Sequence, residues 1–256
     1  MDVTNRFVLD FARQYTHQRP SARVLEFGCG AGRLVIEGRA SGLDITGVDV
    51  FYDGSKDLEE AERSGLVGTC IQKMTDGHIG FPDCSFDLVV NNQVMEHVEN
   101  LDQVLSEISR VLKPGGTVLS IFPASDVFRE GHIGIPFSHW FSSGSRVRFL
   151  FTWALRRLGL GSWKEQSPNA RQWAIDKLKW IDTYTRYRSR AEIFRAFNRY
   201  FRSELKELDY IRYRLLDRPG RELIVDLLRV PLAAAAACAV FRKLAFLVIV
   251  SSKEVE

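Results

Sequence analysis

The sequence predicts an α/β fold in which buried parallel strands alternate with helices, and three observations carry this prediction. Residues 24–27 form a short apolar run that ends in the glycine-rich turn G-C-G-A-G at 28–32, as in a buried strand that turns sharply into a helix. Apolar runs and amphipathic segments then alternate as far as residue 122. Polar residues follow two of these runs, at Asp49 and Asn91. The carboxyl ends of parallel strands are where ligands bind in open sheets.

The elements expected in the first half follow from this spacing. Apolar residues at helical intervals predict a helix over 3–15, which Pro20 ends. The other elements expected here are strands over 24–27, 44–50 and 66–71 and helices over 33–39 and 57–64.

The second half continues the alternation. A strand is expected over 86–90, and the apolar stripe of 101–112 predicts a helix that stops at the K-P-G-G sequence 113–116. A capping box formed by Ser189 and Glu192 predicts the start of a later helix. The remaining expected elements are strands over 117–122 and 209–215, a turn at 219–220, a helix, and a last strand over 244–251.

Composition restricts the class of protein. With 256 residues, 45% hydrophobic and 26% charged, the chain suits one globular domain. A net charge of +3 does not favour nucleic-acid binding. The four cysteines have no C-x-x-C spacing, so we expect no disulfide framework or metal cage, and a reducing cytoplasm. Charged residues near the N-terminus exclude a signal-peptide core there.

The motifs of residues 20–125 carry a family resemblance. A dinucleotide fingerprint needs glycine where Arg33 stands, which argues against NAD. The sequence E-F-G-C-G-A-G at 26–32 instead resembles motif I of class I S-adenosylmethionine (SAM) dependent methyltransferases. The segments F-P-D-C-S-F-D-L-V at 81–89, E-H-V at 96–98 and L-K-P-G-G at 112–116 are similar to those of the ubiquinone-biosynthesis type. On these motifs the chain is identified as a member of that family.

The resemblance implies a fold and a cofactor. The expected fold is a Rossmann-like doubly wound sheet of seven strands, mostly parallel with an antiparallel last strand, in a single domain over 1–256. A helical insertion should follow the fifth strand. The expected cofactor is SAM, and the residues expected to bind it are Glu26, Gly28, Gly30, Gly32, Asp49, Thr75, Asp76, Asn91 and Gln93.

These residues have separate expected roles. Asp49 lies about twenty residues beyond the turn, where a carboxylate accepts hydrogen bonds from ribose hydroxyls; the alternative is a surface carboxylate. Thr75 or Asp76 would bind the adenine amino group, unless both are turn residues. Glu26 would hydrogen-bond around the glycine turn, and Asn91 or Gln93 would reach the methionine part.

Residues 126–202 differ in composition from the rest and form the expected helical insertion, a lid over the substrate. They hold fifteen Lys or Arg against six Asp or Glu, together with all five tryptophans. Such a lid suits an anionic or sugar-bearing acceptor, because Arg pairs with phosphate or carboxylate and Trp stacks on flat faces. The alternative is a segment with its own small core and a solvated cationic face.

Histidine is the natural general base near neutral pH, if the acceptor atom is an oxygen that must lose a proton. The candidates are His97, after the fourth strand, and His132 and His139 in the insertion; each is equally explained as a structural histidine. Glu96 is expected to position cofactor or acceptor. An equivalent glutamate helps to bind a metal in some relatives, but without further ligands the sequence predicts no metal site.

The expected function is methyl transfer from SAM to a small-molecule or sugar-containing acceptor, with oxygen as the preferred acceptor atom. Two alternatives stay open: an RNA methyltransferase that uses the cationic insertion, and a catalytically silent SAM-fold protein that serves as a binding or membrane-associated scaffold. Residues 232–241 are uncharged but too few to span a membrane. A soluble helix is the preferred interpretation, and peripheral contact of 230–241 with the inner face of a membrane is the alternative.

Overall fold

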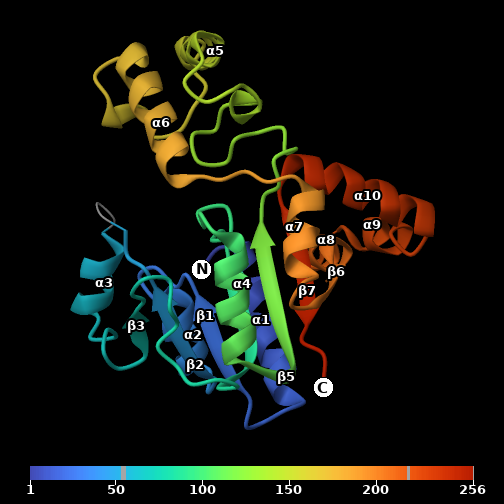
Figure 1. The fold of residues 1–256 in the computed structure, drawn as a ribbon. Helices are drawn as coiled ribbons and strands as arrows, with labels where there is room; N and C mark the ends of the chain where they lie inside the picture. The colour runs from blue at the N-terminus through green and yellow to red at the C-terminus, as the bar shows by residue number, and fades with distance from the viewer. Residues whose placement is uncertain (53–55, 218–219, 256) are drawn as a thin grey trace.

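A seven-stranded sheet forms the centre of the computed structural model, which describes residues 1–52, 56–217 and 220–255 (Figure 1). The strand order is β3-β2-β1-β4-β5-β7-β6. Six strands run in one direction and β7 runs against both of its neighbours. The strands are β1 (Arg23–Phe27), β2 (Asp44–Asp49), β3 (Ile71–Lys73), β4 (Phe86–Asn92), β5 (Leu112–Phe122), β6 (Arg202–Leu205) and β7 (Leu247–Ser252). The predicted fold class is confirmed.

Helices cover both faces of this sheet. Successive side chains of each strand point to opposite faces, and both faces are apolar. Leu25 and Val89 share one layer with α4 and α7. Val24 and Val90 share the other with α1, α2 and α8. The helices are α1 (Val3–His17), α2 (Arg33–Ala40), α3 (Asp57–Arg63), α4 (Leu101–Val111), α5 (Arg146–Arg157), α6 (Ala170–Tyr184), α7 (Arg190–Phe197), α8 (Glu207–Leu216), α9 (Glu222–Leu227) and α10 (Pro231–Leu244).

The strand predicted over 209–215 is wrong, because this segment is helix α8 and the edge strand β6 precedes it. The predicted alternation rested on Ile211, Tyr213 and Leu215, whereas a helical repeat relates Tyr213 to Tyr210. Tyr210 and Tyr213 lie one turn apart, and both rings pack edge-on against Phe7 of α1, with centroids 5.1 and 5.3 Å away. The third strand is also displaced, from the predicted 66–71 to Ile71–Lys73. Pro219 of the predicted turn at 219–220 lies outside the described residues.

The apolar C-terminal segment forms a helix followed by a strand, as the preferred interpretation predicted. Helix α10 precedes β7, which inserts between β5 and β6 in antiparallel pairing. The described residues contain no helix with the length and apolar character needed to cross a membrane.

The segment between β5 and α7, residues 123–189, is called the insertion below. It carries α5, α6 and two short 3-10 helices, Ser138–Trp140 and Lys164–Gln166. Its own apolar cluster contains Ile133, Ile135, Trp173, Ala174 and Ile181. Figure 1 shows it standing above the end of β5, at the carboxyl edge of the parallel strands. Helix α7, in contrast, packs against the sheet through Ile193 and Phe197.

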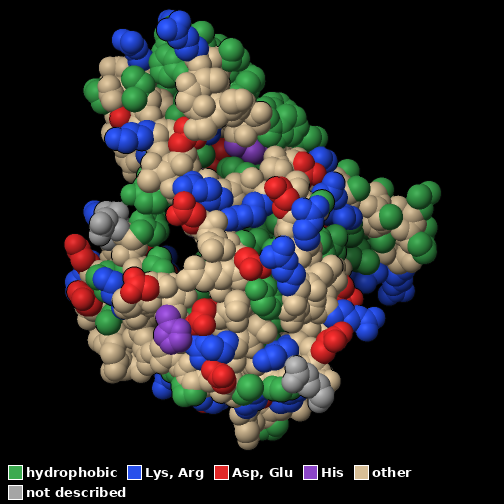
Figure 2. All heavy atoms as spheres, in the orientation of Figure 1, with side chains coloured by type: hydrophobic (Ala, Val, Ile, Leu, Met, Phe, Trp, Pro, Cys, Tyr) green, Lys and Arg blue, Asp and Glu red, His purple; other side chains and the backbone are tan. Residues whose placement is uncertain are grey.

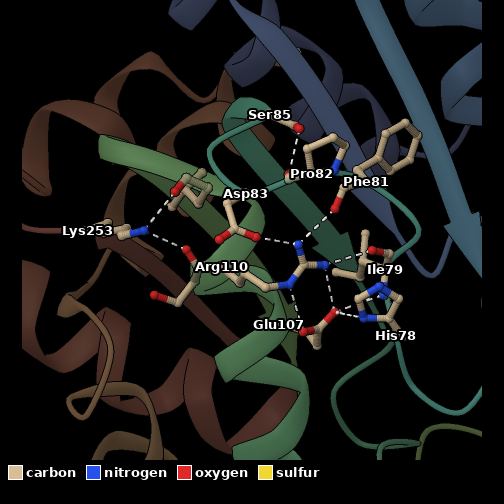
Figure 3. A network of polar contacts seen from close by, with 11 residues as sticks. His78, Ile79, Phe81, Pro82, Asp83, Ser85, Glu107, Arg110 and Lys253 are labelled. Carbon is tan, nitrogen blue, oxygen red and sulfur yellow. Dashed lines mark hydrogen bonds and ion pairs between the residues drawn. The ribbon is translucent and has the colours of Figure 1, made fainter.

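A polar network ties the loop before β4 to helix α4 (Figure 3). The guanidinium of Arg110 donates to the backbone carbonyls of Ile79 and Phe81, each at 2.8 Å. It also donates to the carboxylate of Glu107 at 2.9 Å. Glu107 in turn accepts from the backbone N–H of Ile79 at 3.0 Å. These bonds satisfy loop groups that have no strand partner and hold residues 79–85 against α4.

Candidate cofactor and active site

The glycine turn between β1 and α2 adopts a conformation that side chains would block. Gly28 and Gly32 both have φ of +77°, in the left-handed region. A Cβ atom on Gly28 would lie 2.4 Å from a methyl group of Val94, and one on Gly32 would lie 2.3 Å from a methyl group of Ile71. These two positions of the turn are therefore limited to glycine, both by their backbone conformation and by the side chains packed against them.

Asp49, at the end of β2, is hydrogen-bonded to this turn. One carboxylate oxygen accepts from the backbone N–H of Gly30 at 2.8 Å, and the other accepts from that of Phe51, also at 2.8 Å. A carboxylate oxygen has two lone pairs, so each keeps acceptor capacity for a ligand hydroxyl. The carboxylate is thereby held in one orientation at the carboxyl edge of the sheet.

A cavity of about 680 Å³ opens at this edge, and Figure 2 shows the molecule hollowed below the insertion. Its lining includes Phe27, Gly28, Gly30, Asp49, Gln93 and His97. The cavity brings the glycine turn, the end of β2 and the connection from β4 to α4 to one place.

The other predicted cofactor residues lie around this cavity rather than in its lining. Thr75 and Asp76 are exposed, while their neighbours Met74 and Gly77 line it. Asn91 is buried and donates to the hydroxyl of Ser120 at 2.8 Å. Gly32 starts α2 as its N-cap.

Glu26 lies behind the glycine turn, only 9% exposed, and one of its carboxyl oxygens has no partner among the described residues. Burial, with the nearby charge of Asp49 as a lesser cause, raises the pKa of this carboxyl well above its ordinary value. A protonated Glu26 can donate a hydrogen bond as well as accept one.

Two of the three candidate histidines pack edge-to-face, with ring centroids 4.9 Å apart, and His97 of this pair lines the cavity. The Nε2 atoms of His97 and His132 are 3.2 Å apart. His97 has its Nδ1 atom 2.7 Å from the carbonyl oxygen of Tyr184, and His132 has its Nδ1 atom 2.7 Å from a carboxylate oxygen of Glu130. Burial lowers the pKa of His97. The hydrogen bond and charge of Glu130 outweigh burial and raise the pKa of His132.

Glu96 and His139 complete the group of titratable side chains. Glu96 is 1% exposed, both its carboxyl oxygens lack a partner among the described residues, and burial raises its pKa to about 7. His139 lies apart from the histidine pair, its ring 4.7 Å from that of Tyr187, and burial lowers its pKa.

Sequence comparison identifies the part of the chain that carries the cofactor cavity. Residues 25–120 match a family model described as a methyltransferase domain. The chain is 28% identical over 142 residues to ubiquinone biosynthesis O-methyltransferase of Agrobacterium fabrum, covering 50% of this chain and 57% of that protein. It is 34% identical over 131 residues to EEF1A lysine methyltransferase 4 of Bos taurus, covering 44% and 51%. The chain spans about half the length of these curated relatives.

The fold agrees with this match. A SAM-dependent methyltransferase from Mesorhizobium loti superposes with a TM-score of 0.54 at 17% identity, over 96% of this chain and 100% of that one. Residues 25–120 therefore match a methyltransferase domain, and the chain has the fold of a SAM-dependent methyltransferase.

The site in this methyltransferase domain fits SAM. Its volume lies within the roughly 300–1,000 Å³ typical of small-molecule sites. The bare main chain of Gly28 and Gly30 faces the cavity, and the oriented carboxylate of Asp49 lies beside them. An adenosyl group needs such a close approach to backbone together with an acceptor for its hydroxyls.

Two groups of residues that were not predicted from the sequence complete this site. Glu130 is fully buried and holds His132, Tyr187 donates to it at 2.6 Å, and the spacing E-x-H is its only local signal. Tyr52, after β2, has its ring centroid 5.2 Å from that of Tyr184 at the end of α6. This second contact joins the rim of the cofactor cavity to the insertion, and no sequence pattern indicates it.

Proposed function

We propose that this chain is an active methyltransferase that transfers the methyl group of SAM to an oxygen of a small-molecule or sugar-containing acceptor. The observation that carries the proposal is the single cavity that Gly30, Asp49 and His97 all line. When bound, SAM supplies a methyl carbon on a sulfonium, whose carbon–sulfur bond breaks as the acceptor oxygen bonds the carbon, leaving the electron pair on sulfur.

We propose oxygen as the methylated atom because a hydroxyl must lose a proton during transfer, and this site holds side chains that can take up that proton. His97 lines the cavity and contacts His132, and Glu130 stabilises positive charge on His132. These side chains can accept a proton or favour its loss. The proposal leaves His139, which lies outside this hydrogen-bonded chain, without a catalytic role.

The acceptor is proposed to carry an anionic group. A second cavity, of about 480 Å³, adjoins the first through Gln93, which lines both. Arg129 lines this second cavity, is exposed, and has no ion-pair partner in the part of the chain that the structure describes. A guanidinium in that position suits a phosphate or carboxylate, because it binds either with two parallel hydrogen bonds. The insertion, which carries Arg129, is proposed to be the substrate lid.

The test is transfer of label from methyl-labelled SAM to fractionated cell extract. We expect label in a fraction of anionic small molecules or glycans, with Asp49→Ala as the inactive control. Arg129→Ala should lower transfer at limiting extract and leave SAM affinity, measured by calorimetry, unchanged. Label in RNA would contradict the acceptor class. Tight SAM binding without label in any fraction would contradict the enzymatic function and favour a silent scaffold.

We further propose that α9 and α10 rest on the inner face of a membrane. Helix α10 has no buried residue although its sequence is P-L-A-A-A-A-A-C-A-V-F-R-K-L. Leu223 and Leu232 are 83% and 81% exposed. Figure 2 shows hydrophobic side chains gathered over the projection that these helices form, with Lys and Arg beside it. An apolar helical surface of this kind binds the headgroup boundary of a bilayer.

Vesicle flotation tests this contact. Wild-type protein should float with vesicles containing an anionic phospholipid, and Leu223→Glu with Leu232→Glu should abolish flotation. The matched control is Ile36→Glu, because Ile36 is a half-exposed apolar residue on α2. Equal flotation of wild type and the double variant would contradict the proposal.

A further inference from the structure

Glu96, His97 and His132 form a cluster that cofactor binding does not explain. One donor atom from each lies within 4.8 Å of the other two. Glu96 and His97 follow β4, whereas His132 lies 35 residues beyond His97, in the insertion. The cluster therefore forms only when the insertion folds back over the carboxyl edge of the sheet.

Hydrogen bonds decide which nitrogen of each histidine is free. A backbone carbonyl can only accept, so Nδ1 of His97 carries the hydrogen that it donates to Tyr184. Nδ1 of His132 likewise donates to the carboxylate of Glu130. In the neutral rings both Nε2 atoms therefore present lone pairs, and these face each other across 3.2 Å. Two lone pairs at this distance require a proton or a cation between them.

Glu96 distinguishes these two alternatives. It is 1% exposed and neither of its oxygens has a hydrogen-bond partner among the described residues. A buried carboxylate without a partner is costly. A proton shared by the two histidines leaves Glu96 without a partner, whereas a cation bound by all three side chains gives one of its oxygens a partner.

We propose that Glu96, His97 and His132 bind one divalent transition-metal ion of the Zn²⁺ type. Two ligands at tetrahedral angles with Zn–N of about 2.05 Å place their nitrogens roughly 3.3 Å apart, close to the 3.2 Å of the histidine pair. Imidazole ligands favour zinc over Mg²⁺, which selects oxygen. Glu130 and the Tyr184 carbonyl orient the rings from behind, as carboxylates and carbonyls do around zinc-bound histidines.

Three protein ligands leave a fourth position open on a zinc ion. His97 lines the cofactor cavity, and His132 lines a cavity of about 430 Å³ in the insertion together with Trp163 and Trp180. The role of the ion rests on the proposed function. An acceptor hydroxyl bound at the open position would lose its proton to water more readily, because the ion stabilises the alkoxide. That oxygen would then bond to the methyl carbon as the carbon–sulfur bond of SAM breaks and its electron pair stays on sulfur.

Metal binding is tested without SAM or acceptor, so its outcome does not depend on the proposed function. Chelator-stripped full-length protein is titrated with Zn²⁺ against a chromophoric chelator. Wild type should bind one ion, and Glu96→Gln and His132→Ala should each bind at least tenfold more weakly. The matched control is His78→Ala, which removes an exposed imidazole 2.8 Å from a carboxylate oxygen of Glu107 and should not change the affinity.

Two further measurements distinguish loss of metal binding from loss of the folded structure in the variants. Each metal-free variant should retain the wild-type circular dichroism, and Zn²⁺ should raise the melting temperature of wild type but not of Glu96→Gln. Co²⁺ should give visible absorption bands with wild type that Glu96→Gln changes. Failure of stripped wild type to bind Zn²⁺, or equal affinity in a folded Glu96→Gln, would overturn the metal site and leave a proton-sharing histidine pair.

Discussion

The carboxylate of Asp49 accepts a hydrogen bond from the backbone N–H of Gly30 at 2.8 Å, which joins the end of β2 to the glycine turn after β1. The two residues are 19 positions apart in sequence, and parallel pairing of β1 with β2 brings them together. One carboxylate thus shapes the turn and faces the cofactor cavity.

Asp49→Ala is expected to lower SAM affinity by about 10- to 100-fold, because hydrogen bonds to a charged group contribute roughly 1.5–3 kcal/mol. Calorimetric titration with SAM measures the effect. Asp44→Ala is the matched control, since Asp44 begins the same strand and is exposed at its opposite end. Similar SAM affinities of the two variants would contradict the assigned role of Asp49.

Gly28→Ala is expected to abolish measurable SAM binding. Its Cβ atom would overlap Val94, and its φ of +77° would cost about 1–2 kcal/mol for a side chain. Gly42→Ala separates the two effects, because Gly42 has a φ of +86° but open space around it. We expect Gly42→Ala to lower the free energy of unfolding by about 1 kcal/mol and to leave SAM binding intact. Normal SAM binding by Gly28→Ala would show that the turn tolerates a side chain.

Glu107 is expected to stabilise the fold in a pH-dependent way. The hydrogen bond from Arg110 is the main cause that lowers its pKa to about 2. Because the folded pKa is depressed below the unfolded value of about 4.3, the stabilisation is complete above that value. It is lost as pH falls towards 2.

Glu107→Gln should therefore lower the free energy of unfolding by about 1–2 kcal/mol at neutral pH, and the difference from wild type should disappear near pH 2. Urea denaturation across this range measures it. Both proteins should carry His78→Ala, which removes the imidazole that also faces Glu107. Glu99→Gln, at a carboxylate 86% exposed, should show no such pH dependence. A constant difference between pH 5 and pH 2 would contradict the assignment.

Trp173→Ala is expected to unfold the insertion without unfolding the sheet. Trp173 is fully buried in the insertion's own apolar cluster, and its indole N–H donates to the carbonyl of Ser162 at 3.0 Å. Replacing a buried tryptophan with alanine costs roughly 3–5 kcal/mol. Hydrogen exchange should increase over α5 and α6 and stay unchanged in β1, β4 and β5. Trp163→Ala, at a side chain 56% exposed, is the control. Faster hydrogen exchange in the sheet strands as well would show that the insertion and the sheet unfold as one cooperative unit.

The sheet was predictable because its signals are local. The apolar run before Gly28 and the K-P-G-G stop after α4 identify strand and helix ends within a few residues. The strand predicted over 209–215 was wrong because an alternating pattern and a helical repeat coincide over so short a segment. Packing of Tyr210 and Tyr213 on Phe7 decided in favour of the helix.

The sequence by itself determined the family resemblance, the expected cofactor and the alternation of strands and helices. Each of these depends on residues that lie a few positions apart. Only the tertiary structure decided that His132 contacts His97 and that Glu130 accepts a hydrogen bond from His132. It also decided that the Glu96 carboxyl has no hydrogen-bond partner among the described residues. These contacts depend on how the insertion folds over the sheet edge. Burial of apolar side chains along the whole insertion determines that packing, so no short sequence motif indicates it.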